Sequence, residues 1–176
     1  MTQTLFINAR LIDPVAQTDG LGALLVSDGV ITQVFDEVAP QIAGATVINC
    51  AGNCLAPGIV DIGVKVSEPG ERHKESFRSA GRAAAAGGVT TIVTRPDTAP
   101  AIDTPETLEF VARRATLDAP VRVLPMAALT KGREGREMTE IGFLQDAGAV
   151  AFTDCDRVVT NTKVFSRALT YANSLG

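Results

Sequence analysis

The sequence predicts an α/β fold, in which a β-rich segment is followed by alternating strands and helices. Short apolar runs rich in β-branched residues, separated by turn residues, fill the first fifty positions. Beyond residue 57, a strand-like run followed by a helical pattern occurs four times. Such alternation is typical of parallel strands joined by right-handed crossovers, and it does not by itself distinguish a doubly wound sheet from a (β/α) barrel. The predicted domains are residues 1–55 and residues 56–176.

The N-terminal segment is predicted to hold short strands. The strand-like runs are residues 5–7, 10–12, 23–26, 30–35 and 46–48. The third and fourth of these runs flank Ser27-Asp28-Gly29. Asp-Gly between two apolar runs favours a β-hairpin, because both residue types tolerate the positive φ that the turn requires.

The C-terminal segment is predicted to hold four strands and four helices. The strands are residues 59–62, 89–93, 121–124 and 149–152, and the helices are residues 76–86, a helix from 105 onward, 134–147 and 164–174. Gly87-Gly88 ends the first helix, and Thr104 with proline at the next position is typical of a helix start. A buried stripe on the second helix is predicted at Leu108, Val111, Ala112 and Ala115. Met138, Ile141 and Leu144 are expected to face inward from the third.

The composition excludes several classes of protein. With 45% hydrophobic and 20% charged residues, the chain is neither disordered nor collagen-like. No stretch approaches the roughly 20 uninterrupted apolar residues of a membrane span. A net charge of −4 without a Lys/Arg-rich run argues against nucleic acid as the main partner. The cysteines form no CxxC pair and the first four residues are not a basic leader, so reduced thiols and a cytoplasmic location are expected.

Several motifs follow one another along the chain. They are Ala56-Pro57-Gly58-Ile59-Val60-Asp61, Glu68-Pro69-Gly70-Glu71, His73-Lys74-Glu75-Ser76, and the stretches 83–91, 102–107, 129–132 and 148–154. In this order and spacing the chain resembles the N-terminal half of a dihydroorotase of the amidohydrolase superfamily. The resemblance implies a β-sandwich-like N-terminal segment, part of a composite sandwich, followed by the first four or so βα units of a (β/α)8 TIM-type barrel. A full barrel takes roughly 250 residues.

The resemblance also implies where a zinc site would lie. The family places two zinc-binding histidines at the end of its first barrel strand, as Asp-x-His-x-His, and neutral imidazoles are natural zinc ligands. At those positions this chain has Asp61-Ile62-Gly63-Val64-Lys65. Glycine offers no ligand, and a lysine ammonium repels a cation. No catalytic residue and no resident metal are therefore predicted for this chain, although zinc is the cofactor of the family.

Substrate-binding positions of the family differ as well. Ser67 stands where the family has an arginine that binds the substrate carboxylate, and serine lacks the bidentate, charge-assisted geometry of a guanidinium. Asp97, in Arg95-Pro96-Asp97-Thr98, replaces a substrate-binding asparagine and would repel an anionic substrate. Asp154 still matches an acidic position that the family uses near its metals, so it is the one candidate relic of a metal site.

Lys65 and Arg95 follow adjacent predicted strands, which leaves two interpretations open. Either they form a small cationic pocket that binds a carboxylate or phosphate, or they fill a former metal site and pair with Asp97 and Asp154. His73, the single histidine, lies among charged neighbours and is expected to be a solvated loop residue.

Three functional hypotheses follow. The first is a non-catalytic dihydroorotase homologue of pyrimidine biosynthesis that is a structural partner of aspartate carbamoyltransferase. The second is the N-terminal part of an active zinc enzyme that converts dihydroorotate and water to N-carbamoyl-aspartate. The third is an anion-binding regulatory module using Lys65 and Arg95. Because half a barrel has open strand edges, the chain is expected to form homo-oligomers or to pair with a missing barrel half, as a fragment or a shortened gene product.

Overall fold

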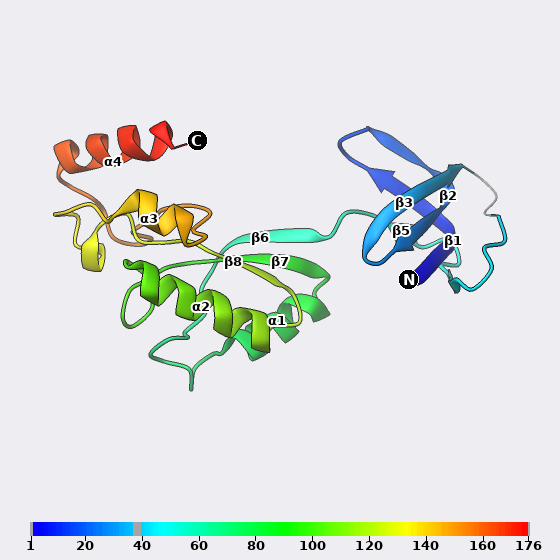
Figure 1. The fold of residues 1–176 in the computed structure, drawn as a ribbon, viewed down its shortest axis with the longest axis horizontal. Helices are drawn as coiled ribbons and strands as arrows, with labels where there is room; N and C mark the ends of the chain where they lie inside the picture. The colour runs from blue at the N-terminus through cyan, green and yellow to red at the C-terminus, as the bar shows by residue number, and fades with distance from the viewer. Residues whose placement is uncertain (1, 37–39, 176) are drawn as a thin grey trace. The chain divides into compact units, whose positions relative to one another are not determined.

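The computed structural model describes residues 2–36 and 40–175 and divides into two compact units, Met1–Pro57 and Gly58–Gly176. Within the described residues, the first unit holds only strands and every helix lies in the second (Figure 1). None of the helices in these ranges is both long and apolar enough to cross a membrane.

The first unit is a five-stranded sheet. Its strands are β1 (Gln3–Asp13), β2 (Thr18–Ser27), β3 (Val30–Asp36), β4 (Thr46–Asn49) and β5 (Cys54–Leu55). The strand order is β3-β2-β1-β4, with β5 also paired to β1. The first three strands are antiparallel neighbours, whereas β4 and β5 run parallel to β1. The part of this unit that the structure describes therefore forms one sheet, and its place in a composite sandwich stays a prediction.

The predicted hairpin is confirmed between β2 and β3, where Asp28 and Gly29 have φ angles of 49° and 82°. The predicted runs 5–7 and 10–12 are not separate strands, because both belong to β1. The register of β1 against β2 shifts between Phe6 and Ala9, so β1 carries one extra residue there. Such a bulge changes the pairing without ending the strand.

The second unit is built on a parallel sheet in the order β6-β7-β8, and the two helices that connect these strands cover one face. The strands are β6 (Ile59–Val64), β7 (Val89–Thr94) and β8 (Arg122–Pro125), and the connecting helices are α1 (Phe77–Ala86) and α2 (Pro105–Asp118). Figure 1 shows both helices on the same side of the sheet. The core between them includes Val66, Phe77, Ile92, Ile102, Leu108 and Val111.

Both predicted helix starts are confirmed by their caps. The Ser76 hydroxyl accepts a hydrogen bond from the Ser79 amide, and the Ser79 hydroxyl accepts one from the Ser76 amide, which is a capping box. The Thr104 hydroxyl accepts a hydrogen bond from the Thr107 amide. The predicted stripe is confirmed at three of its four positions: Leu108, Val111 and Ala115 are buried, whereas Ala112 is half-buried.

The predicted helix 134–147 is wrong over its first half. A short 3₁₀ turn, η1 (Lys131–Arg133), is followed by a loop, and α3 begins only at Ile141 and ends at Asp146. Gly135 has a φ of 69°, which a right-handed helix does not contain. The Lys131 amide donates to the Glu137 carbonyl instead, closing the loop across its own base. Of the residues predicted to face inward, Ile141 and Leu144 are buried on α3, whereas Met138 lies in the loop before it.

The predicted strand 149–152 is reduced to one parallel bridge, between Ala127 and Phe152. Three backbone hydrogen bonds nevertheless hold this segment against the end of β8: Val150 N to Pro125 O at 3.1 Å, Ala127 N to Ala151 O at 3.0 Å and Thr153 N to Ala127 O at 3.0 Å. It therefore extends the parallel arrangement beyond β8. The predicted helix after it is confirmed as α4 (Thr162–Ser174), on which Ala168 is buried.

Candidate functional site

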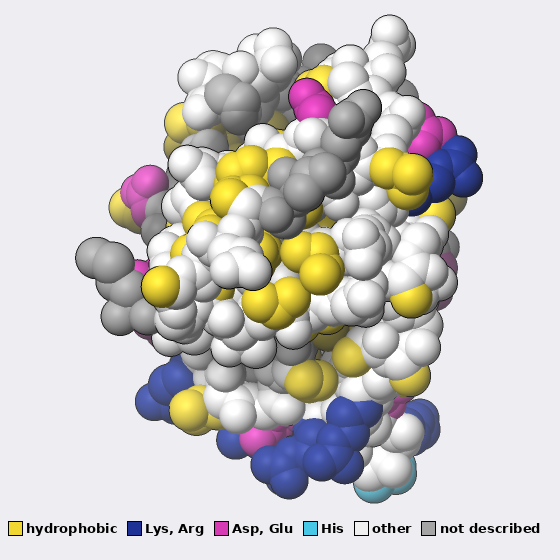
Figure 2. Space-filling model, turned by 90° about the vertical axis from the view of Figure 1, so that its right-hand side faces the viewer, with side chains coloured by type: hydrophobic (Ala, Val, Ile, Leu, Met, Phe, Trp, Pro, Cys, Tyr) yellow, Lys and Arg dark blue, Asp and Glu magenta, His cyan; other side chains and the backbone are white. Residues whose placement is uncertain are grey.

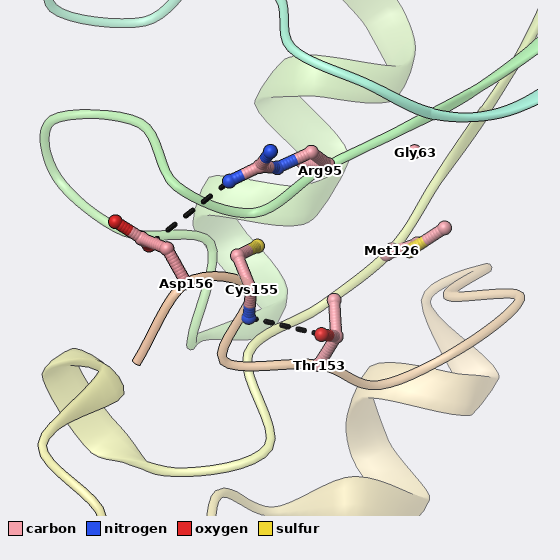
Figure 3. A pocket seen from close by; sticks show the side chains of 6 residues that line it. All are labelled: Gly63, Arg95, Met126, Thr153, Cys155 and Asp156. Atoms are coloured by element: carbon pink, nitrogen blue, oxygen red, sulfur yellow. Dashed lines mark hydrogen bonds and ion pairs between the residues drawn. The ribbon is translucent and has the colours of Figure 1, made fainter. Parts of the chain in front are cut away.

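A pocket lies where the parallel strands of the second unit end. It has a volume of about 450 Å³ and is lined by Gly63, Arg95, Met126, Thr153, Cys155 and Asp156. These residues come from the end of β6, the positions just after β7 and β8, and the segment after the Ala127–Phe152 bridge (Figure 3). The carboxyl ends of parallel strands are where α/β proteins bind ligands, so this is the candidate site.

Gly63 sits at a bulge in β6. The register passes from Ile62 opposite Val93 to Val64 opposite Thr94, so Gly63 is an extra residue in the strand. Its φ is 94°, in the region that favours glycine, and a Cβ added there would have no heavy atom within 4 Å. In a regular strand side chains alternate between the two faces, and this bulge interrupts that alternation. Gly63 therefore lines the pocket with its backbone alone and offers no side-chain ligand.

Lys65, Arg95 and Asp97 come together beside the pocket. The Lys65 ammonium lies 3.0 Å and the Arg95 guanidinium 2.9 Å from the same oxygen, Oδ2, of Asp97. The Asp97 side chain is only 4% exposed, whereas those of Lys65 and Arg95 are 53% and 30% exposed. Burial acts to lower the pKa of Arg95, but its contacts with Cys155 and Asp97 outweigh this and raise it.

The Asp97 group leaves buried polar atoms unsatisfied. Arg95 Nε, Asp97 Oδ1 and Thr94 Oγ1 are all buried, and none has a hydrogen-bond partner among the described residues. Buried donors and acceptors without partners are uncommon, because each costs the free energy of removing it from water. These atoms identify the end of β7 as an incompletely satisfied polar site.

Asp154 does not line the pocket. It is buried, and its Oδ1 accepts hydrogen bonds from the amides of Leu129 and Thr130, each at 3.0 Å. The Thr130 hydroxyl donates to Oδ2, and Arg133 donates to the Asp154 carbonyl at 3.2 Å. Asp154 thus anchors the loop after β8. Neither Lys65 nor Arg95 contacts it within the described residues.

The remaining predicted positions are not among the residues that line the pocket. Asp61 is exposed on β6, and Ser67 lies in the loop after it, where its carbonyl accepts from the Glu71 amide at 2.8 Å. His73 is exposed in the turn before α1. Asp156 was not singled out from the sequence, because only the fold brings it within 4.0 Å of Arg95.

The donor set does not fit a zinc ion. Within residues 2–36 and 40–175, no three histidine, cysteine, aspartate or glutamate side chains are grouped so as to hold a metal. The pocket offers Cys155 and Asp156, with an arginine beside them. Zinc sites use at least three protein ligands, and an adjacent guanidinium opposes a cation.

The chain is similar to proteins of one family. A family model described as dihydro-orotase-like matches residues 52–176. A dihydroorotase of Sulfurihydrogenibium sp. is 38% identical over 169 residues, covering 96% of this chain and 40% of the relative. A dihydroorotase of Wolbachia sp. subsp. Brugia malayi is 40% identical over 174 residues, covering 97% and 39%. The chain thus spans about two fifths of the length of these relatives.

Solved structures show a similar fold. A D-hydantoinase has a TM-score of 0.77 at 21% identity, covering 99% of this chain and 38% of its own. The L-hydantoinase (dihydropyrimidinase) of Arthrobacter aurescens has a TM-score of 0.73 at 24% identity, covering 86% and 32%. At these identities the likeness concerns the fold and leaves the chemistry of the site to its own residues.

Proposed function

The chain belongs to the dihydro-orotase-like family, and from this premise we propose that it is a non-catalytic member acting in pyrimidine biosynthesis. Its parallel β6-β7-β8 sheet is proposed to form the first part of a (β/α)8 barrel. The observation that carries the proposal concerns the carboxyl ends of β6, β7 and β8, which we call the mouth of the sheet. Gly63 and Lys65 stand at the expected zinc-ligand positions, and Lys65 is already paired with Asp97.

Ring opening of a cyclic amide needs an activated water and a group that polarises the carbonyl. In the pocket the candidate bases are the Asp156 carboxylate and the Cys155 thiol. Asp156 is 73% exposed and paired with Arg133, which favours its ionised, solvated form. Arg95 is the one cation lining the pocket among the described residues, and Asp97 partly neutralises it. Such a set supports binding better than hydrolysis.

The direct test is turnover of dihydroorotate by the full-length protein in the presence of added zinc. The dihydroorotase of Sulfurihydrogenibium sp., prepared in the same buffer, is the positive control. We expect no turnover above the uncatalysed rate. Turnover at even about 1% of the control, lost with a chelator, would contradict the proposal, since a metal site contributes several orders of magnitude to such rates.

A structural role requires a partner, and the proposed partner is aspartate carbamoyltransferase. Val60 and Ile62 lie on the same face of β6, which is an edge strand of the sheet in the described residues, and they are 55% and 72% exposed, so a partner or a further barrel strand can cover them. Co-elution of the two full-length proteins from a sizing column at micromolar concentration would support this pairing. Complete separation at that concentration would refute it.

A second candidate is the N-terminal part of an active zinc dihydroorotase. The relatives favour it, because this chain covers only 38–41% of their length. Zinc ligands can come from the part of such proteins that this chain does not cover. The two candidates differ in their response to Lys65→Ala. In an active enzyme this change near the site alters turnover, whereas in the non-catalytic protein there is no turnover to alter.

A further inference from the structure

Two buried carboxylates lie between α1, α2 and the loop before α1. The side chains of Glu68 and Asp118 are only 5% and 8% exposed. Arg114 donates to both of them, from Nε to Glu68 at 3.1 Å and from NH2 to Asp118. In all, three arginines lie within 3.8 Å of these two carboxylates: Arg72, Arg78 and Arg114. The cluster therefore has one positive charge in excess.

The carboxylate oxygens of this cluster already have other donors. Glu68 accepts from Arg114 through Oε1 and from a backbone amide through Oε2. Asp118 accepts from Arg78 through Oδ1 and from Arg114 through Oδ2. The contacts of Arg72, at 3.5 Å from Glu68 and 3.8 Å from Asp118, are ion pairs without a hydrogen bond. Arg72 is thus the cation in excess, and its side chain is 60% exposed, so its N–H groups can meet a partner.

The positive charge continues along α1. Arg78 and Arg82 are one helical turn apart and both are exposed, so their side chains lie next to each other on one face of the helix. This helix packs directly on the residues that follow α2, because a Cβ added at Gly81 would lie only 2.7 Å from Pro120. The two arginines therefore project from a rigid surface.

This part of the chain is cationic although the whole chain is anionic. Residues 68–86 and 113–122 hold seven lysines and arginines and four aspartates and glutamates, a net charge of +3, so the other residues carry −7 of the total of −4. Figure 2 shows Lys and Arg side chains gathered at the lower end of the view. A long polyanion such as nucleic acid reaches past this area to the anionic remainder, which repels it. A short acidic segment does not, because exposed charges more than about 10 Å apart are largely screened at 0.1 M salt.

From these contacts we infer that the surface formed by Arg72, Arg78 and Arg82, which we call the arginine surface, is a docking site for an acidic segment of a protein partner. Carboxylates match the planar N–H groups of a guanidinium, and arginine is enriched in protein interfaces. The buried carboxylates hold two of these arginines in place, which reduces the entropy lost on binding. None of the three residues lines the pocket at the mouth, so this surface is separate from the candidate site.

The test uses the full-length protein and two dye-labelled peptides, hexaglutamate and hexaglutamine, with fluorescence anisotropy as the readout. We expect saturable binding of hexaglutamate with a Kd below about 1 mM at low ionic strength, weaker binding as salt is added, and no binding of hexaglutamine. Long single-stranded DNA at the same concentration of charge is expected to displace the peptide only poorly.

Variants locate the binding on the arginine surface. Arg72→Gln leaves every carboxylate oxygen of the cluster with its donor, so the fold should be retained while hexaglutamate binds about threefold more weakly. Arg72→Gln/Arg78→Gln is expected to weaken binding about tenfold. Arg136→Gln is the matched control, since Arg136 is 85% exposed and outside the arginine surface. Circular dichroism establishes that each variant is folded.

Equal binding of the two peptides, or no saturable binding of hexaglutamate, would overturn the inference. DNA that binds more tightly than hexaglutamate would overturn it too, because the surface would then fit phosphates. The same holds if the folded double variant binds as well as the parent, or if Arg136→Gln weakens binding equally. If the double variant does not fold, Arg82→Gln should weaken binding about twofold, and unchanged binding would count against the arginine surface. Because no readout involves turnover, zinc or aspartate carbamoyltransferase, failure here leaves the proposed function standing.

Discussion

The helix-covered face of the sheet in the second unit and the carboxyl ends of its strands are built from the same strands but differ in chemistry. On the helix side, Ile92 of β7 and Leu108 of α2 are almost fully buried in a continuous apolar core. At the carboxyl ends of the strands, Gly63 interrupts β6 and charged residues converge on Asp97. The helix-covered face needs only apolar side chains that can be buried, whereas the chemistry of the mouth depends on the identity of particular residues. A chain can therefore keep the fold of its family while its site changes.

The largest expected effect lies on the helix side. Leu108→Ala removes a fully buried side chain and should lower the free energy of unfolding by about 2–5 kcal/mol. Leu117→Ala on the same helix is the control, because Leu117 is 71% exposed and its loss should cost less than about 0.5 kcal/mol. Urea denaturation measures both. Equal effects would show that the helix side is not the core of this unit.

Asp154→Ala removes the anchor of the loop after β8. It leaves the amides of Leu129 and Thr130 without their acceptor, so the expected loss of stability is about 2–3 kcal/mol. Asp146→Ala removes an exposed carboxylate on α3 and should have little effect. If the two substitutions destabilise alike, Asp154 does not anchor the loop.

Gly63→His tests whether the mouth can be returned to metal binding. The left-handed φ of 94° strains any L residue, so a loss of about 1–3 kcal/mol is expected even though the added Cβ meets no atom. Zinc should not raise the melting temperature of this variant, or of Gly63→His/Lys65→His. A zinc-dependent rise in either would mean that the bulge does not prevent ligation.

The smallest expected effect on stability is that of Lys65→Met. Lys65 is 53% exposed, so its pairing with Asp97 should contribute less than about 1 kcal/mol to folding. Lys131→Met removes another exposed pairing, with Glu137, and should behave similarly. A loss of several kcal/mol in Lys65→Met alone would show that the mouth is a folding element and not a variable site.

Local signals in the sequence predicted local structure well. Ser76 and Thr104 mark helix starts because a cap involves only residues three positions apart. Asp28-Gly29 marks a hairpin for the same reason. The helix predicted from 134 was wrong over its first half because Gly135 has a positive φ. It lies in a loop that the hydrogen bond from the Lys131 amide to the Glu137 carbonyl closes.

The site was predictable only in part. The convergence of Lys65 and Arg95 on Asp97 was one of two interpretations that the sequence left open, and adjacent parallel strands make it geometrically simple. The bulge at Gly63 depends on pairing with β7, and the anchoring role of Asp154 depends on amides 24 and 25 residues away. No local pattern encodes contacts of that separation.

The measurement that tests the central claim most directly is the zinc content of the full-length protein after equilibrium dialysis against micromolar zinc. The dihydroorotase of Sulfurihydrogenibium sp. serves as the reference. Since Gly63 and Lys65 supply no ligand, less than about 0.1 zinc per chain is expected, because affinity depends on a complete set of deprotonated ligands. One zinc bound per folded chain, with Cys155 protected from alkylation by it, would contradict the account.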